Sequence, residues 1–203
     1  AAYEKWGVEC VKHFNGMFAF FIWDENRKIG FAARDPMGVK PFFYYKSVDT
    51  FAFASEASAL IKSKIAPLNV NEDYLAEYFT APYFTGSTST PYSNIQILNA
   101  GETILLSEES ITKKSYFNYQ FKKTSDTSEN DWHKLLEYSV NKQLQADCEV
   151  GLFLSGGLDS SLLAALSPRP VKTWTIRYEE NSIDDYKDSL IVKSDDFEFA
   201  RYA

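Results

Sequence analysis

Short apolar runs separated by polar turns fill the first part of the chain and predict strands. The predicted strands are residues 17–23, 29–34, 42–46, 51–54, 95–98, 102–106 and 111–117. The first is apolar throughout, so we expect it to be buried on both faces. The fifth and sixth flank Asn99-Ala100-Gly101, which is a hairpin signal. This part of the chain is therefore predicted to be largely antiparallel β.

The hydrophobic pattern changes after a polar segment, residues 118–130, which we interpret as an interdomain linker. Helical spacing predicts earlier helices at residues 1–13, 56–63 and 71–80, and a long one that carries Trp132, Leu135, Leu136, Val140 and Leu144 on one face. Strands at residues 150–154 and 171–178 enclose a helix, and residues 195–203 open another helix. A strand–helix–strand order predicts a parallel sheet.

The segment Ser155-Gly156-Gly157-Leu158-Asp159-Ser160-Ser161 lies between the apolar runs 150–154 and 162–166. A small-residue loop between a strand and a helix directs backbone N–H groups and the positive helix end at one point, which favours an anion such as phosphate. The G-x-G-x-x-G pattern and the Walker lysine are both missing from this segment. Asp159 at the mouth of the loop indicates Mg²⁺ between carboxylate and phosphate. The alternative is a glycine-rich turn in which Asp159 or Ser160 only caps the helix.

Composition narrows the function classes. The formal net charge of the 203 residues is −7, which disfavours a general nucleic-acid binder, and 45% hydrophobic residues suffice for a core. No apolar run reaches membrane-spanning length, so we expect no membrane association. Cys10 and Cys148 are far apart and lack metal spacing, which favours a reduced, cytoplasmic setting. We interpret His13 and His133 as surface or helix residues rather than metal ligands.

The loop S-G-G-L-D-S-S, preceded by Gly151-Leu152-Phe153-Leu154, resembles the pyrophosphate loop of the N-type ATP pyrophosphatases. Within them it is most similar to the synthetase domain of glutamine-dependent asparagine synthetases. The resemblance implies an α/β, adenine nucleotide α hydrolase-like domain that binds ATP and Mg. It assigns phosphate contacts to Ser155, Gly156, Gly157 and Ser160, and Mg to Asp159. It assigns adenosine contacts to Leu154 and Ile176.

The first half resembles the later part of a class II glutamine amidotransferase domain. The motifs are Asn15 to Phe20, Trp23-Asp24, Arg34 to Pro41 and Ala54-Ser55-Glu56. The resemblance implies an α+β fold, the αββα sandwich of the N-terminal nucleophile enzymes. The residues themselves favour structural roles: we expect Arg34 and Asp35 to pair in a tight loop, and Glu56 to favour a helix start.

The family's nucleophile is an N-terminal cysteine, whereas this chain begins Ala1-Ala2-Tyr3. Cys10 lies in a predicted helix and is rejected for this role. We therefore expect a fragment, with residues 1–120 an N-terminally truncated glutaminase-like domain and residues 121–203 a C-terminally truncated ATP pyrophosphatase domain. No glutaminase catalytic residue is expected within it, and the fragment is expected to be inactive.

The resemblance implies that the parent enzyme, a ligase, makes asparagine from aspartate, glutamine and ATP through a β-aspartyl-adenylate, releasing AMP and pyrophosphate. Two alternatives stay open. One is a related amide or lactam synthetase with a degenerate glutaminase domain, and the other is a non-enzymatic stress or storage protein with a glutaminase-like fold. A homodimer is compatible with the sequence, which leaves the oligomeric state and the carboxylate substrate open.

Overall fold

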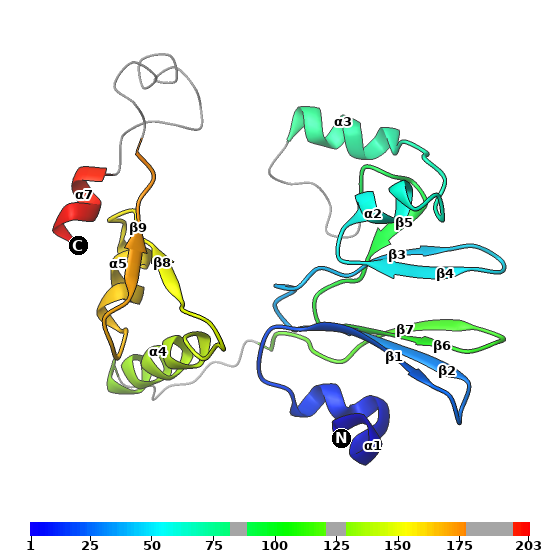
Figure 1. Ribbon diagram of the computed structural model, residues 1–203, viewed down its shortest axis with the longest axis horizontal. Coiled ribbons are helices and arrows are strands. Elements are labelled where there is room, and N and C mark those ends of the chain that lie inside the picture. The colour runs from blue at the N-terminus through cyan, green and yellow to red at the C-terminus, as the bar shows by residue number, and fades with distance from the viewer. Residues whose placement is uncertain (82–88, 121–128, 178–196) are drawn as a thin grey trace. The chain divides into compact units, whose positions relative to one another are not determined.

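The computed structural model describes residues 1–81, 89–120, 129–177 and 197–203. The chain divides into two compact units, Ala1–Phe121 and Lys122–Ala203, and each is described by itself (Figure 1). Most of the segment expected to be a linker, residues 121–128, lies outside the described residues.

Two antiparallel sheets form the frame of the first unit (Figure 1). The larger sheet has the strand order β1-β2-β6-β7, and the smaller has the order β4-β3-β5. The strands are Ala19–Asp24 (β1), Ile29–Arg34 (β2), Phe43–Lys46 (β3), Phe51–Ala54 (β4), Ile95–Ile97 (β5), Glu102–Leu106 (β6) and Ile111–Ser115 (β7). Each lies close to its predicted position, so the strands of this unit are confirmed.

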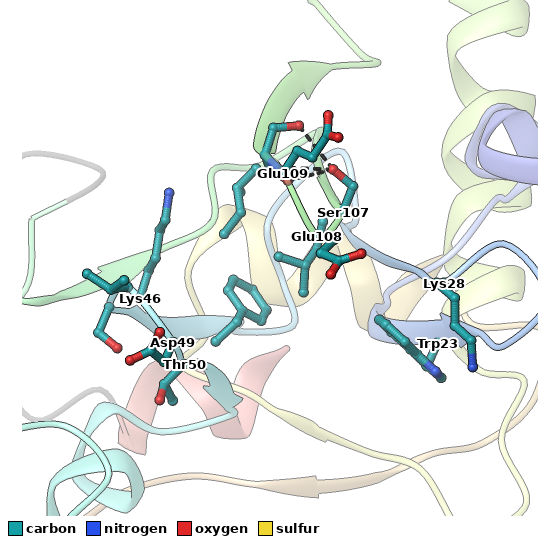
Figure 2. Close-up of a pocket in the computed structure, with 14 residues that line it drawn as sticks. Trp23, Lys28, Lys46, Asp49, Thr50, Ser107, Glu108 and Glu109 are labelled. Carbon is teal, nitrogen blue, oxygen red and sulfur yellow. Dashed lines mark hydrogen bonds between the residues drawn. The ribbon is translucent and has the colours of Figure 1, made fainter.

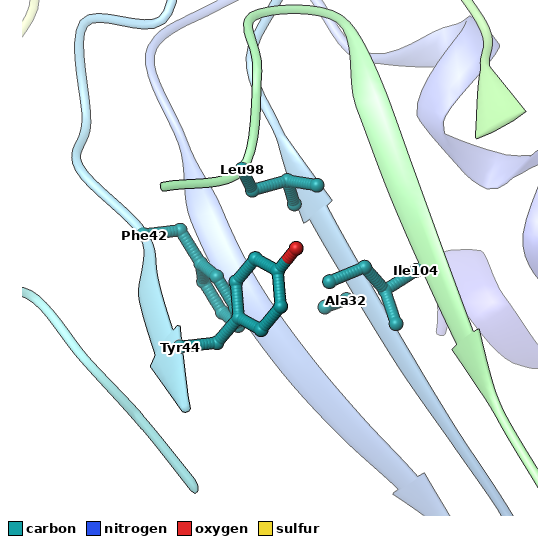
Figure 3. Close-up of a cluster of buried hydrophobic side chains, with 5 residues drawn as sticks. All are labelled: Ala32, Phe42, Tyr44, Leu98 and Ile104. Atoms are coloured by element: carbon teal, nitrogen blue, oxygen red, sulfur yellow. The ribbon is translucent and has the colours of Figure 1, made fainter. Parts of the chain in front are cut away.

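A cluster of buried side chains joins the two sheets. Ala32 and Ile104 come from the larger sheet, whereas Phe42, Tyr44 and Leu98 come from the segments of the smaller sheet (Figure 3). Ala32, Leu98 and Ile104 have no exposed surface. This cluster is the interior layer of the unit, and its burial supplies a large part of the driving force for packing the sheets together.

The described residues of this unit include the helices α1 (Ala2–Trp6), α2 (Ala57–Lys62) and α3 (Glu72–Thr80) and the 3₁₀-helix η1 (Gly7–His13). The single helix predicted for residues 1–13 is wrong, because Gly7 adopts φ of 58° and interrupts the α-helical backbone. The start of α3 is confirmed: the Asn71 side chain accepts a hydrogen bond from the Tyr74 N–H at 3.2 Å.

Helices cover the outer face of each sheet. Phe31 and Ala33 of β2 pack with Cys10 and Val11 of η1. On the smaller sheet, Leu60 of α2 belongs to a second outer cluster. Because side chains alternate along a strand, β2 contributes to both its inner and its outer cluster. The layer order helix, sheet, sheet, helix is that of the predicted αββα sandwich.

Burial of the first strand differs from the prediction. β1 is partly buried at most positions and Trp23 is half exposed, whereas β2 is buried at Gly30 through Ala33. The reason is the position of β1 at the edge of its sheet, where it pairs with β2 alone. An apolar run therefore identified a strand here but not which strand is central.

The hairpin predicted from residues 95–98 and 102–106 is also wrong. β5 pairs with β3 in the smaller sheet, and β6 pairs with β2 and β7 in the larger one. The turn between them crosses from one sheet to the other, because the Leu98 N–H donates to the Phe42 carbonyl at 2.9 Å and the Gly101 N–H donates to the Asp35 carbonyl at 2.9 Å. Gly101 has φ of 66°, a backbone conformation that favours glycine.

The second unit contains a short parallel sheet with helices around it. Its elements are α4 (Glu129–Gln143), β8 (Gly151–Phe153), α5 (Leu158–Ala165), β9 (Lys172–Trp174) and α7 (Phe197–Tyr202). β8 and β9 pair in parallel, with Leu152 opposite Thr173. The predicted strand–helix–strand order with a parallel pair is therefore confirmed.

The long helix α4 forms as predicted, but its apolar face is only partly covered. Val140 is buried, whereas Trp132 and Leu135 are each more than half exposed.

Candidate functional site

The segment 155–161 connects the end of β8 to the first turn of α5. Gly157 is the N-cap of α5, and no side chain among the described residues caps this helix end. The alternative in which Asp159 or Ser160 caps the helix is therefore wrong for the free chain. Instead the Ser160 hydroxyl donates back to the Gly157 carbonyl at 3.3 Å. Uncapped N–H groups at a helix start are free to bind an anion.

Serine side chains hold the loop in shape. The Ser155 N–H donates to Ser160 Oγ at 3.2 Å, and the two hydroxyl oxygens are 3.1 Å apart. The Gly157 N–H donates to Ser155 Oγ at 3.4 Å. Gly156 between them has φ of 74°, a conformation that favours glycine. The structure thus brings Ser155, Gly156, Gly157 and Ser160 together at one strand end.

The two residues expected at the adenosine lie on the neighbouring strand ends. The Leu154 N–H donates to the Trp174 carbonyl at 2.8 Å, and the Leu154 carbonyl accepts from Thr175 Oγ1 at 2.7 Å. Leu154 is buried, whereas Ile176 is two-thirds exposed. Ile176 can therefore contact a ligand directly, while Leu154 joins the loop to β9.

Asp159 lies in the first turn of α5 with its side chain exposed. No group of three or more metal-ligating side chains exists within the part of the chain that the structure describes. Mg²⁺ in proteins commonly takes one or two carboxylates and completes its shell with substrate phosphates and water. A single exposed carboxylate beside an anion loop fits that mode of binding and does not fit a metal held by protein alone.

Sequence reasoning missed a contact between the loop and α7. A Cβ atom on Gly156 would lie 2.5 Å from the Ala200 nitrogen and 2.6 Å from Phe199 Cβ. α7 is held at its other end by Arg177, whose guanidinium lies 4.8 Å from the Phe197 ring centre. Gly156 is the sequence feature that could have indicated this contact, because a glycine allows such close approach of another backbone.

The loop of the first unit that begins at Arg34 is built differently from the prediction. Among the described residues, Arg34 and Asp35 form no ion pair with each other, so the expected pairing is wrong. Arg34 donates instead to three backbone carbonyls, those of Gly38, Lys40 and Leu98. A guanidinium has enough donors to close a turn around itself in this way.

Asp35 is almost fully buried and organises the same loop. It accepts hydrogen bonds from the N–H groups of Phe18, Met37, Val39 and Lys40 at 2.9–3.2 Å. Burial by itself raises the pKa of Asp35, but the four N–H donors outweigh it and hold that pKa below its ordinary value. The loop is therefore a structural element and not a pair of catalytic groups.

Cys10, His13 and His133 lie outside the loops described above. Cys10 is fully buried, and burial raises the pKa of its thiol, so the thiol is protonated at neutral pH. His13 stacks on Trp6 with ring centres 4.2 Å apart. His133 Nε2 lies 3.3 Å from Oε1 of Glu137, one turn further along α4. Each is accounted for by its local packing.

Comparison with known proteins identifies both units. The family model described as glutamine amidotransferase domain matches residues 1–117, more than half of the chain. The chain belongs to this family. A second family model, described as asparagine synthase, matches residues 131–200, after the amidotransferase match in the chain. The resemblances to the glutamine amidotransferase domain and to the asparagine synthetases are thereby confirmed.

Several of the relatives that match this chain are named as asparagine synthetases. The chain is 35% identical over 192 residues to "Asparagine synthetase [glutamine-hydrolyzing] 3" of Bacillus subtilis, covering 89% of this chain and 31% of that protein. Synthetase 1 of the same organism is 29% identical, with 91% of this chain and 30% of that protein covered. The chain therefore spans about a third of the length of these relatives.

A structural match is more distant. Glutamine phosphoribosylpyrophosphate amidotransferase from B. subtilis aligns with a TM-score of 0.37 at 14% identity, covering 90% of this chain and 40% of that one. This level is too low to assign a fold. Among the described helices of the amidotransferase, none combines the length and the apolar character needed to span a membrane.

Proposed function

We propose that this chain is part of a glutamine-hydrolysing asparagine synthetase that uses ATP. The observation that carries the proposal is the Ser155–Ser161 loop, which joins a parallel strand to an uncapped helix. It is supported by the order of the two family matches along the chain. One half would supply ammonia from glutamine, and the other would activate the acceptor.

The chemistry explains why both halves are needed. A carboxylate is a poor electrophile, so ammonia does not attack aspartate directly. Transfer of AMP from ATP to the side-chain carboxylate forms a β-aspartyl-adenylate and releases pyrophosphate. Ammonia then attacks the acyl carbon, and AMP leaves as asparagine forms.

The loop would stabilise the charge that develops on the departing pyrophosphate. Hydrogen bonds within the loop hold Ser155, Gly157 and Ser160 together, so the loop backbone beside the start of α5 is ordered before the reaction. The Ser160 hydroxyl would turn from the Gly157 carbonyl to donate to the phosphate. The exposed Ile176 would contact the adenosine, and Leu154 would keep β8 and β9 in register beneath it.

Asp159 would hold Mg²⁺ together with the phosphates. The bound ion would neutralise phosphate charge that otherwise repels this carboxylate. We expect Asp159→Ala in the complete enzyme to lower aspartate-dependent exchange of labelled pyrophosphate into ATP by about a hundredfold or more, as removal of a transition-state electrostatic contact does.

Asp147→Ala is the matched control. Asp147 is exposed and precedes β8, at the strand end opposite the loop. Asp147→Ala changes the net charge of this unit by the same amount as Asp159→Ala but should leave the exchange of pyrophosphate into ATP unchanged. Normal exchange in Asp159→Ala would remove Asp159 from the mechanism, and equal loss in both variants would show an effect of charge or folding alone.

A further inference from the structure

A small cavity opens between the two sheets of the first unit, and the loop at residues 155–161 belongs to the other unit. Its volume is about 440 Å³. It is lined by Tyr44, Lys46, Asn94, Gln96, Ile111 and Lys113. These residues come from β3, from β5 and the residue before it, and from β7, so both sheets contribute.

One lysine is held in place at this cavity. Lys113 Nζ donates to the Tyr44 hydroxyl oxygen at 2.9 Å and to Gln96 Oε1 at 3.4 Å. The Tyr44 hydroxyl in turn donates to Gln96 Oε1. The ammonium also lies 5.6 Å from the centre of the Tyr44 ring. Tyr44 is only 4% exposed, so its ring is fixed by packing, whereas Lys113 itself is exposed at the mouth of the cavity.

The lining of the smaller cavity carries positive charge only. It contains two ammonium groups, on Lys46 and Lys113, and no carboxylate. Within the described ranges neither lysine forms an ion pair. Ammonium groups that line the same cavity repel each other, and an anion between them would relieve that repulsion.

A second cavity adjoins the first and shares Lys46 and Ile111 with it. Its volume is about 970 Å³, and its lining combines apolar side chains, among them Trp23, Phe51 and Leu106, with the carboxylates of Asp49, Glu108 and Glu109 (Figure 2). An anion held between the two lysines would thus have room next to it for an organic group, and these carboxylates favour a group without further negative charge.

We propose that the lysine cavity binds the phosphate group of a small phosphorylated molecule, a site separate from the proposed synthetase function. Charge favours phosphate over a carboxylate. A phosphate monoester carries close to two negative charges above its second pKa of about 6, matching two ammonium groups, whereas a carboxylate carries one. Lysine is also an established phosphate-binding residue, acting as a point charge.

Inorganic phosphate is the first probe, added at pH 8 to the ¹⁵N-labelled chain at ionic strength held constant with chloride. Backbone amide spectra separate this cavity from the loop at residues 155–161, which also attracts phosphate. We expect saturable shifts at Tyr44, Gln96 and Lys113. Lys113→Gln should weaken this titration by about tenfold, the expected cost of one charged hydrogen bond.

Lys114→Gln is the matched control. Lys114 neighbours Lys113 on β7 but points to the opposite face of the sheet, so the same change of charge should leave the titration unaltered. Tighter binding of phenyl phosphate, with further shifts at Phe51, would identify a phosphate ester as the ligand, and equal binding would identify free phosphate. No saturable shift at these residues, or equal weakening in both lysine variants, would overturn the proposal.

Discussion

At the scale of single residues, Asp35 is the side chain on which the first unit depends most. Its carboxylate accepts hydrogen bonds from four backbone N–H groups, three in the turn that follows it and one, that of Phe18, from a distant segment. The nearby Tyr116 hydroxyl donates to the Arg34 carbonyl at 2.7 Å, and burial together with the Asp35 charge raises the pKa of Tyr116 to about 12. The turn is therefore stabilised by an ionised, buried carboxylate.

Replacing Asp35 with asparagine should lower the free energy of unfolding by about 3 kcal/mol, because an amide group presents N–H donors where the backbone already donates. Urea unfolding followed by circular dichroism measures the change. Asp49→Asn, at an exposed position in the β3–β4 turn, is the control and should cost little. An equal effect of the two changes would contradict the role of Asp35.

The same group predicts a dependence on pH. Because the folded-state pKa of Asp35 lies below its unfolded value of about 3.9, its contribution is complete above that pH. It is lost as the pH falls through the lower folded-state pKa. The Asp35→Asn variant should lack this part of the acid sensitivity, so the stability difference between the two proteins should shrink in acid.

At the scale of elements, the contact of α7 with Gly156 links the candidate site to the last described helix. Gly156→Ala would place a side chain at φ of 74° and against the α7 backbone. We expect a loss of about 1–2 kcal/mol from the backbone conformation alone. Urea unfolding followed by tryptophan fluorescence measures it.

Gly157→Ala is the comparison variant for stability. Gly157 has φ of −71°, and a Cβ there would meet only Ser155 Oγ at 3.4 Å. Its unfolding should stay close to that of the parent chain. If both alanine variants were equally stable, neither the conformation of Gly156 nor its contact with α7 would matter to the fold.

Elements themselves were well predicted by local pattern. β2 spans the residues expected of it, and β8 and β9 pair in parallel as the strand–helix–strand order implied. Pairing between distant elements was not predictable in the same way. Asn99-Ala100-Gly101 has the residues of a hairpin turn, yet its flanking strands join different sheets, because hydrogen bonds to Phe42 and Asp35 are made only in the folded unit.

The loop at residues 155–161 was located from sequence because its chemistry is contiguous along the chain. The set of four N–H donors to Asp35 could not be located from the sequence, since one of them, Phe18, is seventeen residues away. The expected ion pair of Arg34 with Asp35 failed for a related reason. Neighbours in sequence on a strand end point to different sides, and each found backbone partners.

At the scale of the whole molecule, the two units differ in how much core they contain. The first unit has three buried clusters. In the described part of the second unit, the buried hydrophobic residues are Val140, Leu154 and Leu166. Burial of apolar surface is the main source of stability, so the units should not be equally stable.

We expect residues 1–120 expressed alone to give the dispersed amide spectrum of the same residues in the whole chain, and to unfold cooperatively. Residues 121–203 alone should unfold over a broader range of urea. Calorimetry or urea titration of the two pieces makes the comparison. A collapsed spectrum for residues 1–120, or a sharper transition for residues 121–203, would contradict the assignment of the cores.

The pairing of β2 with β6 has a consequence for how the protein is made. β1 and β2 are synthesised early, but the other edge of β2 has no partner until residues 102–106 have left the ribosome. At about 5–20 residues per second, that edge stays open for several seconds. An apolar strand with an unpaired edge is a template for association with other chains. We therefore expect the first unit to need shielding by chaperones until β6 has been translated.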